Sequence, residues 1–116
     1  MVDPETQTVH VIGGEGESFN DPLTSTETLN LNENKWEIGS GLPESVFASS
    51  AVASKSSEYV GYLVGGAGVN TAKTGKIWQL RRGDLTWLDS PRVLQTPRYH
   101  HTAVNVNFDD IPGCLI

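Results

Sequence analysis

Short apolar runs that end in glycine pairs form the clearest pattern of this chain, and the pattern occurs twice. Thr8–Ile12 and Tyr59–Val64 are rich in residues that favour β-strands, and a Gly-Gly pair follows each run. Glycine permits a positive φ, so each pair marks a sharp exit from a strand. Gly14 recurs as Gly66, 52 residues later. Self-similarity at this period predicts a repeat architecture.

Each glycine pair is followed by polar loop residues and then by further strand patterns. The second strands are expected at 27–31 and 76–80, the third strands at 35–38 and 85–88, and strands of small residues at 48–53 and 100–105. Trp36 and Trp87 take the same place in the two third strands, 51 residues apart. We expect both tryptophans to be wedges buried between neighbouring sheets.

The order of apolar strand, double glycine and later tryptophan resembles the kelch repeat, the unit of one blade of a kelch β-propeller. In this alignment Leu31 matches Leu80, and Leu29 takes the place where kelch blades usually carry an aromatic residue, as Trp78 does. The resemblance covers most of the chain, from about residue 8 to residue 106. It implies an all-β fold of four-stranded antiparallel blades. Two blades form an incomplete ring, because propellers usually have about four to eight.

The phase of the repeat predicts how the domain is divided. If the small-residue strand is A and the others are B, C and D, residues 1–107 form two kelch-like blade equivalents that run B-C-D, A-B-C-D, A. The first blade is expected to lack an A strand. The last strand of the chain is itself an A strand, so it could complete the first blade of another copy. Residues 108–116 form an untypical C-terminal tail. We therefore expect the chain to be a piece of a longer propeller. Open blade edges favour self-association.

Composition and charge narrow the class of partner. The formal net charge of −6 and the pI of about 4.8 argue against nucleic acid and anionic membranes, since both bind basic surfaces. The first residues lack the basic lead and apolar core of a secretory signal. The single cysteine, Cys114, excludes an internal disulfide framework. A cytoplasmic location is therefore favoured.

Several residue groups suggest chemistry, but each has a simpler interpretation. The glycines at 13–16 and 65–68 open no helical pattern, as a phosphate-binding loop would require, and are interpreted as blade turns. His100 and His101 are adjacent on a predicted strand and point to opposite faces, so we expect no metal site. No Gly-x-Ser-x-Gly nucleophile elbow occurs. We expect no cofactor and no enzymatic activity.

The longest loops are predicted at one end of the blades, between strands B and C and between strands D and A. Variable loops on a rigid scaffold usually carry binding. The candidate partner-binding residues on these loops are Phe19, Asn70, Arg92, Arg98 and Tyr99; for Tyr99 the alternative is a packing role at a strand start. We expect a protein-interaction module, an adaptor or scaffold whose partner is another protein. The alternatives are a fragment of a kelch-type propeller enzyme, such as a galactose-oxidase-like oxidase, and a subunit that completes a propeller by oligomerising.

Overall fold

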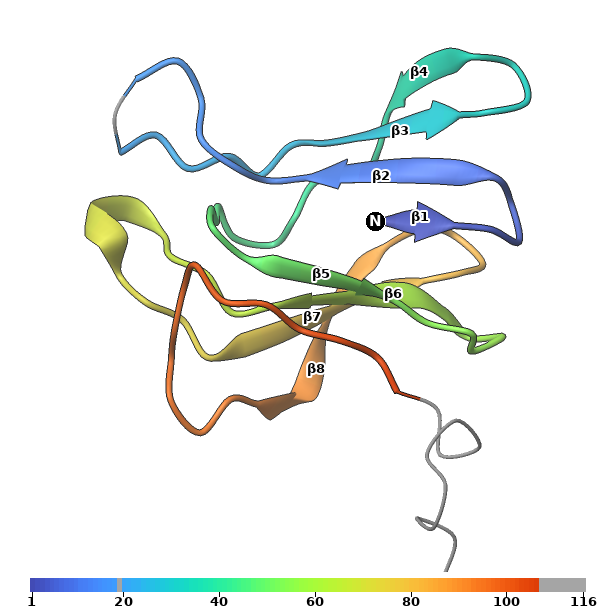
Figure 1. Cartoon of the computed structure of the whole chain (residues 1–116). Coiled ribbons are helices and arrows are strands. Elements are labelled where there is room, and N and C mark those ends of the chain that lie inside the picture. Colours follow the sequence, from blue (N-terminus) through green and yellow to red (C-terminus); the bar gives the residue numbers. More distant parts are fainter. Residues whose placement is uncertain (19, 107–116) are drawn as a thin grey trace, which may run out of the picture.

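Two four-stranded antiparallel sheets make up the fold (Figure 1). The computed structural model describes residues 1–18 and 20–106. The first sheet consists of β1 (Val2–Asp3), β2 (Thr8–Ile12), β3 (Thr26–Asn30) and β4 (Lys35–Ile38). The second consists of β5 (Ser50–Ala53), β6 (Tyr59–Val64), β7 (Lys76–Arg81) and β8 (Trp87–Val93). Strand order follows chain order in both sheets, which confirms the all-β class.

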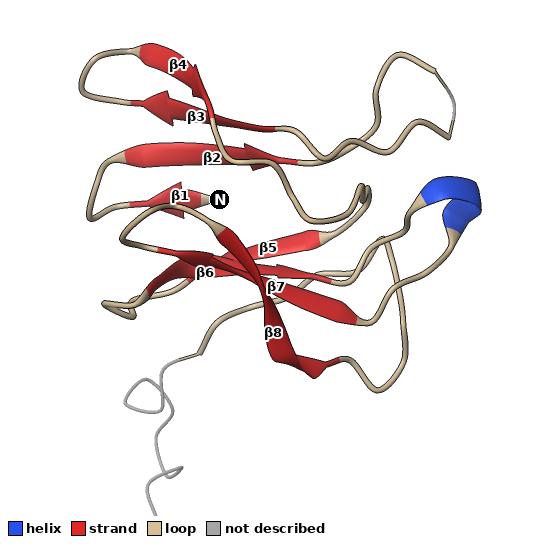
Figure 2. Ribbon diagram, turned by 180° about the vertical axis from the view of Figure 1, so that it is seen from behind, coloured by secondary structure: helices blue, strands red, loops and turns tan. Residues whose placement is uncertain are grey.

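The sheets are consistent with two propeller-like blades that do not close into a ring. Strands β1 and β5 are the edge strands nearest the other sheet, while β4 and β8 are the edge strands farthest from it (Figures 1 and 2). The one helical element within the described residues is a 3-10 turn, Val69–Thr71. No helix in this part of the chain is long and apolar enough to cross a membrane.

Strand pairing corrects the alignment of the two repeats. Leu29 lies opposite Trp36, and Leu80 lies opposite Trp87. Leu29 is therefore the counterpart of Leu80, and Trp78 corresponds to Glu27, which faces Val11 as Trp78 faces Leu63. The sequence alignment was wrong by two residues. A shift of two leaves every side chain on the same face of the sheet, so the hydrophobic alternation could not reveal it.

Both ends of the chain differ from the predicted strand phase. The first sheet has a first strand after all, because β1 pairs with β2 through Val2 and Val9. Met1 and His10 extend this pairing, with the Met1 ammonium donating to the His10 carbonyl at 3.0 Å and the His10 amide donating to the Met1 carbonyl at 2.7 Å. Residues 100–105, predicted as a strand, form no strand. This segment contacts β5 through a side-chain hydrogen bond from Asn105 Nδ2 to the Ala53 carbonyl, 2.8 Å, and not through a strand ladder.

The hydrophobic core lies between the sheets and is built mainly from the second one. Its members are Leu42, Val46, Val60, Leu63, Trp78, Leu80 and Trp87. Met1 and Ile12 of the first sheet pack against this cluster. One face of the second sheet is therefore covered by the first sheet.

Candidate interaction surfaces

Two loops that are far apart in sequence are joined at the end predicted to bind partners. Asn20 Nδ2 donates to Asn70 Oδ1 at 2.9 Å, and the Asn70 amide donates to Asn20 Oδ1 at 2.7 Å. Asn70 and Thr71 have positive φ values of 58° and 53°, a conformation that a β-branched residue such as threonine seldom adopts. The side-chain bonds thus hold the exposed Asn70 in a defined loop conformation. Phe19, the neighbouring candidate, lies outside the described residues.

Arg98 and Tyr99 lie at the same end of the sheets. The Gly66 amide donates to the Arg98 carbonyl at 2.8 Å, which ties this segment to the turn after β6. The Tyr99 ring packs against Phe47, with centroids 6.3 Å apart, and against His100, at 4.7 Å. Tyr99 is half-buried in these ring contacts, although no strand begins beside it, while the Arg98 side chain is exposed. The structure brings Asn70, Arg98 and Tyr99 to one end of the molecule.

Arg92 lies on a strand and not on the loop predicted at 89–99. β8 continues to Val93, where it pairs with Lys76. The Arg92 side chain lines a hollow of about 540 Å³ on the outer face of the second sheet, which it shares with Tyr62 and Ile77. Arg92 therefore belongs to a different surface from the other candidates.

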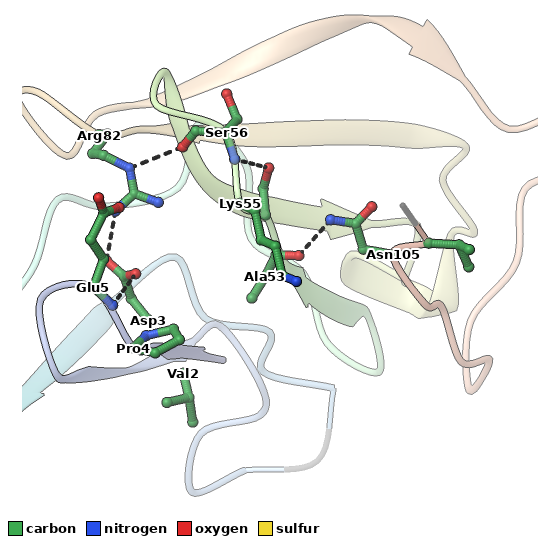
Figure 3. A pocket seen from close by; sticks show the side chains of 11 residues that line it. Val2, Asp3, Pro4, Glu5, Ala53, Lys55, Ser56, Arg82 and Asn105 are labelled. Carbon is green, nitrogen blue, oxygen red and sulfur yellow. Dashed lines mark hydrogen bonds and ion pairs between the residues drawn. The ribbon is translucent and has the colours of Figure 1, made fainter. Parts of the chain in front are cut away.

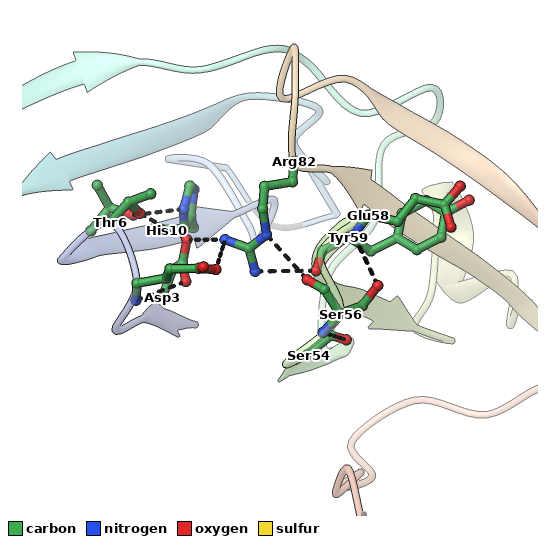
Figure 4. A network of polar contacts seen from close by, with 10 residues as sticks. Asp3, Thr6, His10, Ser54, Ser56, Glu58, Tyr59 and Arg82 are labelled. Atoms are coloured by element: carbon green, nitrogen blue, oxygen red, sulfur yellow. Dashed lines mark hydrogen bonds and ion pairs between the residues drawn. The ribbon is translucent and has the colours of Figure 1, made fainter.

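A charged network joins the two sheets at the end opposite these loops (Figure 4). Arg82, just after β7, donates from Nη1 to Asp3 of β1 at 2.9 Å, and the same nitrogen is 3.0 Å from Glu5. The guanidinium also donates to the carbonyls of Ser56 and Tyr59. The Asp3 and Arg82 side chains are only 3% and 16% exposed. The pair therefore links the first strand of one sheet to the turns of the other.

A groove of about 720 Å³ opens beside this network, between β1 and the turn after β5 (Figure 3). Two cations line the groove: Arg82 pairs with Asp3 and Glu5, whereas Lys55 takes part in no ion pair among the described residues. The hydroxyl of Ser54 accepts a hydrogen bond from the Ser56 amide, and the hydroxyl of Ser56 accepts one from the Glu58 amide, each at 3.0 Å. These bonds stabilise the turn after β5. Arg82, Ser54 and Ser56 thus stabilise the fold, and among these three residues no nucleophile is paired with a base.

His10 occupies a buried polar position beside the network. Its Nε2 is 3.1 Å from the Thr8 hydroxyl, and its Nδ1 is 3.2 Å from the Thr28 hydroxyl. Burial lowers the pKa of His10, although the charge of Asp3 acts in the opposite direction. Burial alone would raise the pKa of Asp3, but the hydrogen bond from Thr6 and the charge of Arg82 outweigh it and lower that pKa below its usual value.

These shifts predict that acid destabilises the fold in two stages. The unfolded chain binds a proton on His10 near pH 6.5, where the folded chain resists it, so stability is full above this pH and falls as the pH drops below it. A second loss follows as the pH falls through the lowered pKa of Asp3. Urea unfolding at a series of pH values measures both stages. His10→Gln should remove the first stage and leave the second, and an unchanged first stage would assign it to another group.

The outer face of the first sheet carries several apolar side chains together with Glu27, and no other element of the described residues covers it. Its rows place Leu29 opposite Trp36 and Glu27 opposite Ile38. Val11, Trp36 and Ile38 are 45%, 52% and 89% exposed. Trp36 was predicted to be a buried wedge; this is wrong, because β4 is covered by no sheet in the part of the chain that the structure describes, and its four residues are all exposed.

The same positions in the second sheet are buried. Leu63, Leu80 and Trp87, the counterparts of Val11, Leu29 and Trp36, are 2%, 2% and 5% exposed. The second repeat thus shows that these side chains are buried when another sheet covers the face that carries them. The repeat pattern alone marked both tryptophans, but it did not show that one of the two faces lacks a neighbour.

Among the described residues, no three His, Cys, Asp or Glu side chains gather so as to hold a metal ion. No family model matches the chain, and no curated protein matches it. What the sheets themselves show is an architecture of two propeller-like blades.

Proposed function

We propose that this chain is a protein-interaction module of the kelch-repeat type, which binds through the outer face of its first sheet. The observation that carries the proposal is the exposure of Val11, Trp36 and Ile38 on one face. Contiguous apolar side chains on a surface mark interaction sites, and tryptophan is a common energetic anchor of interfaces. The two repeated sheets and their glycine turns support the kelch assignment.

The polar clusters favour a binding protein over an enzyme. Arg82 is held by Asp3 and two backbone carbonyls, and His10 is held by two threonine hydroxyls. These groups stabilise the junction of the sheets. The end that carries Asn70, Arg98 and Tyr99 offers a second, more polar surface on the same scaffold.

Site-specific photo-crosslinking tests which surface binds protein. A photoreactive benzoylphenylalanine replaces Trp36 in one variant and Glu37 in a second, matched variant, since these neighbours on β4 point to opposite faces. We expect protein adducts from position 36, with yields at least about tenfold above position 37, because an interface anchor is enclosed on binding. A third variant carries the probe at Tyr99. Adducts from position 99 without adducts from position 36 would move the binding surface to the loops.

A further inference from the structure

The contact between the two sheets shows how one blade face is covered in this molecule. A hollow between them is lined from the first sheet and its exit by His10, Ile12, Thr26, Thr28, Gly39 and Ser40, and from the second sheet by Leu80, Leu85 and Trp87. Trp87 is 5% exposed here. The inner face of the first sheet therefore packs against Trp87 of the second sheet, and we call this part of the face the seat of Trp87.

The chain contains a second copy of this seat. Tyr62 pairs with Gln79 as His10 pairs with Thr28, and Val64 pairs with Ile77 as Ile12 pairs with Thr26. The four second-sheet residues all line the 540 Å³ hollow on the outer face of the second sheet, together with Ser90 and Arg92. Ser90 and Arg92 come after the Asp89–Trp78 pair of β8, as Gly39 and Ser40 come after the Ile38–Glu27 pair of β4. The outer hollow is thus the repeat counterpart of the seat that Trp87 occupies.

A matching tryptophan is also present, on the outer face of the other sheet. Trp36 is the counterpart of Trp87 by strand pairing, and it is 52% exposed on the outer face of the first sheet. Seat and tryptophan lie on opposite outer faces, so one copy cannot join them by itself. Two copies can.

We propose that copies of this chain associate head-to-tail, with Trp36 on the first sheet of one copy entering the hollow beside Tyr62, Ile77 and Arg92 on the second sheet of the next. This inference rests on the proposed function of the first sheet's outer face and names its occupant. The contact is heterologous, so each copy keeps one free face of each kind and assembly can continue to a ring or an open chain.

The charges on the two faces are complementary. Glu27 lies on the face of Trp36, and Arg92 lines the hollow. Within the described part of the chain, neither takes part in an ion pair. Arg92 lines the hollow that receives Trp36, so in the docked pair its guanidinium can lie by the Trp36 ring, and such cation–π contacts are favourable. The same arginine can approach Glu27.

Mixing two variants tests the direction of docking. Trp36→Ser removes the tryptophan, and Arg92→Glu places a carboxylate in the hollow. Both residues are exposed, so we expect both variants to fold, which circular dichroism and melting curves check. In sedimentation velocity the unmodified chain is expected to form larger species as its concentration rises. Trp36→Ser should lower the association constant by about 30-fold, the size of an interface hot spot, and Arg92→Glu by about tenfold. Glu37→Ser, a change on the other face of β4, should leave association unchanged.

At a concentration where each variant alone is monomeric, the mixture should form 1:1 dimers and nothing larger. Each dimer would use the intact tryptophan of the Arg92→Glu copy and the intact hollow of the Trp36→Ser copy. No heterodimer in the mixture, or association weakened by Trp36→Ser alone, would indicate a symmetric face-to-face contact and overturn the proposal. A chain that stays monomeric at all concentrations would also overturn it. If position 36 still crosslinks to a different protein in that case, the proposed function stands without self-association.

Discussion

Replacing Trp87 by alanine is expected to lower the free energy of unfolding by about 3 to 5 kcal/mol. Trp87 is 5% exposed and belongs to the core cluster with Leu80 and Trp78. Alanine would leave a cavity in the contact between the two sheets, since His10 and Thr28 of the first sheet line the other side of the hollow. Urea unfolding of dilute protein, followed by circular dichroism, measures the change.

Trp36→Ala is the matched control, because it removes the same side chain from the counterpart position. With Trp36 at 52% exposure, we expect a loss of less than about 1 kcal/mol in the isolated copy. Equal losses for the two variants would mean that the outer face of the first sheet is as well covered as the inner one. That result would remove the basis for a binding surface there.

Replacing Arg82 by methionine is expected to cost about 3 kcal/mol, because it strands the buried Asp3 carboxylate without its cation. Methionine keeps much of the apolar stem, so the loss reports the charge and its hydrogen bonds. The pKa of Asp3 should rise in this variant, since the Arg82 charge lowers it in the native chain. The Asp3 stage of the acid destabilisation should then be smaller and end at a higher pH, because the folded and unfolded pKa values of Asp3 lie closer together.

The neighbouring arginine provides the control for this prediction. Arg81 pairs with Asp84, but both side chains are about half exposed, at 46% and 51%. Surface ion pairs contribute little to stability. Arg81→Met should therefore change the unfolding curve much less than Arg82→Met. If the two variants behave alike, the Asp3–Arg82 contact does not hold the sheets together.

The repeated strands and glycine turns were accessible from sequence, and the ends of the chain were not. The glycine pairs adopt the expected positive φ, with values of 61° and 101° at Gly13 and Gly14. β1 could not be predicted, because a strand of two residues shows no periodicity. It is stabilised in part by the backbone hydrogen bonds between Met1 and His10. The two-residue register error had no signal in the hydrophobic pattern.

The arrangement of the candidate surfaces could be predicted only in part, for a related reason. Loop position pointed to Asn70, Arg98 and Tyr99, which the structure brings to one end. The exposure of Trp36 depends on which sheets are present around it, and a repeat pattern gives the same residue in a covered and an uncovered sheet. Arg82 was missed because its partner Asp3 lies 79 residues away, in a segment with no pattern of its own.

Hydroxyl-radical footprinting of Trp36 tests most directly whether the outer face of the first sheet is a binding surface. The oxidation rate of Trp36 is measured by mass spectrometry over a range of protein concentrations. We expect the rate to fall several-fold as the chain associates, while the rate of Tyr99 at the loop end stays constant, because only the sheet face is enclosed. A Trp36 rate that stays constant while larger species form, with Tyr99 protected instead, would contradict the assignment of binding to this face.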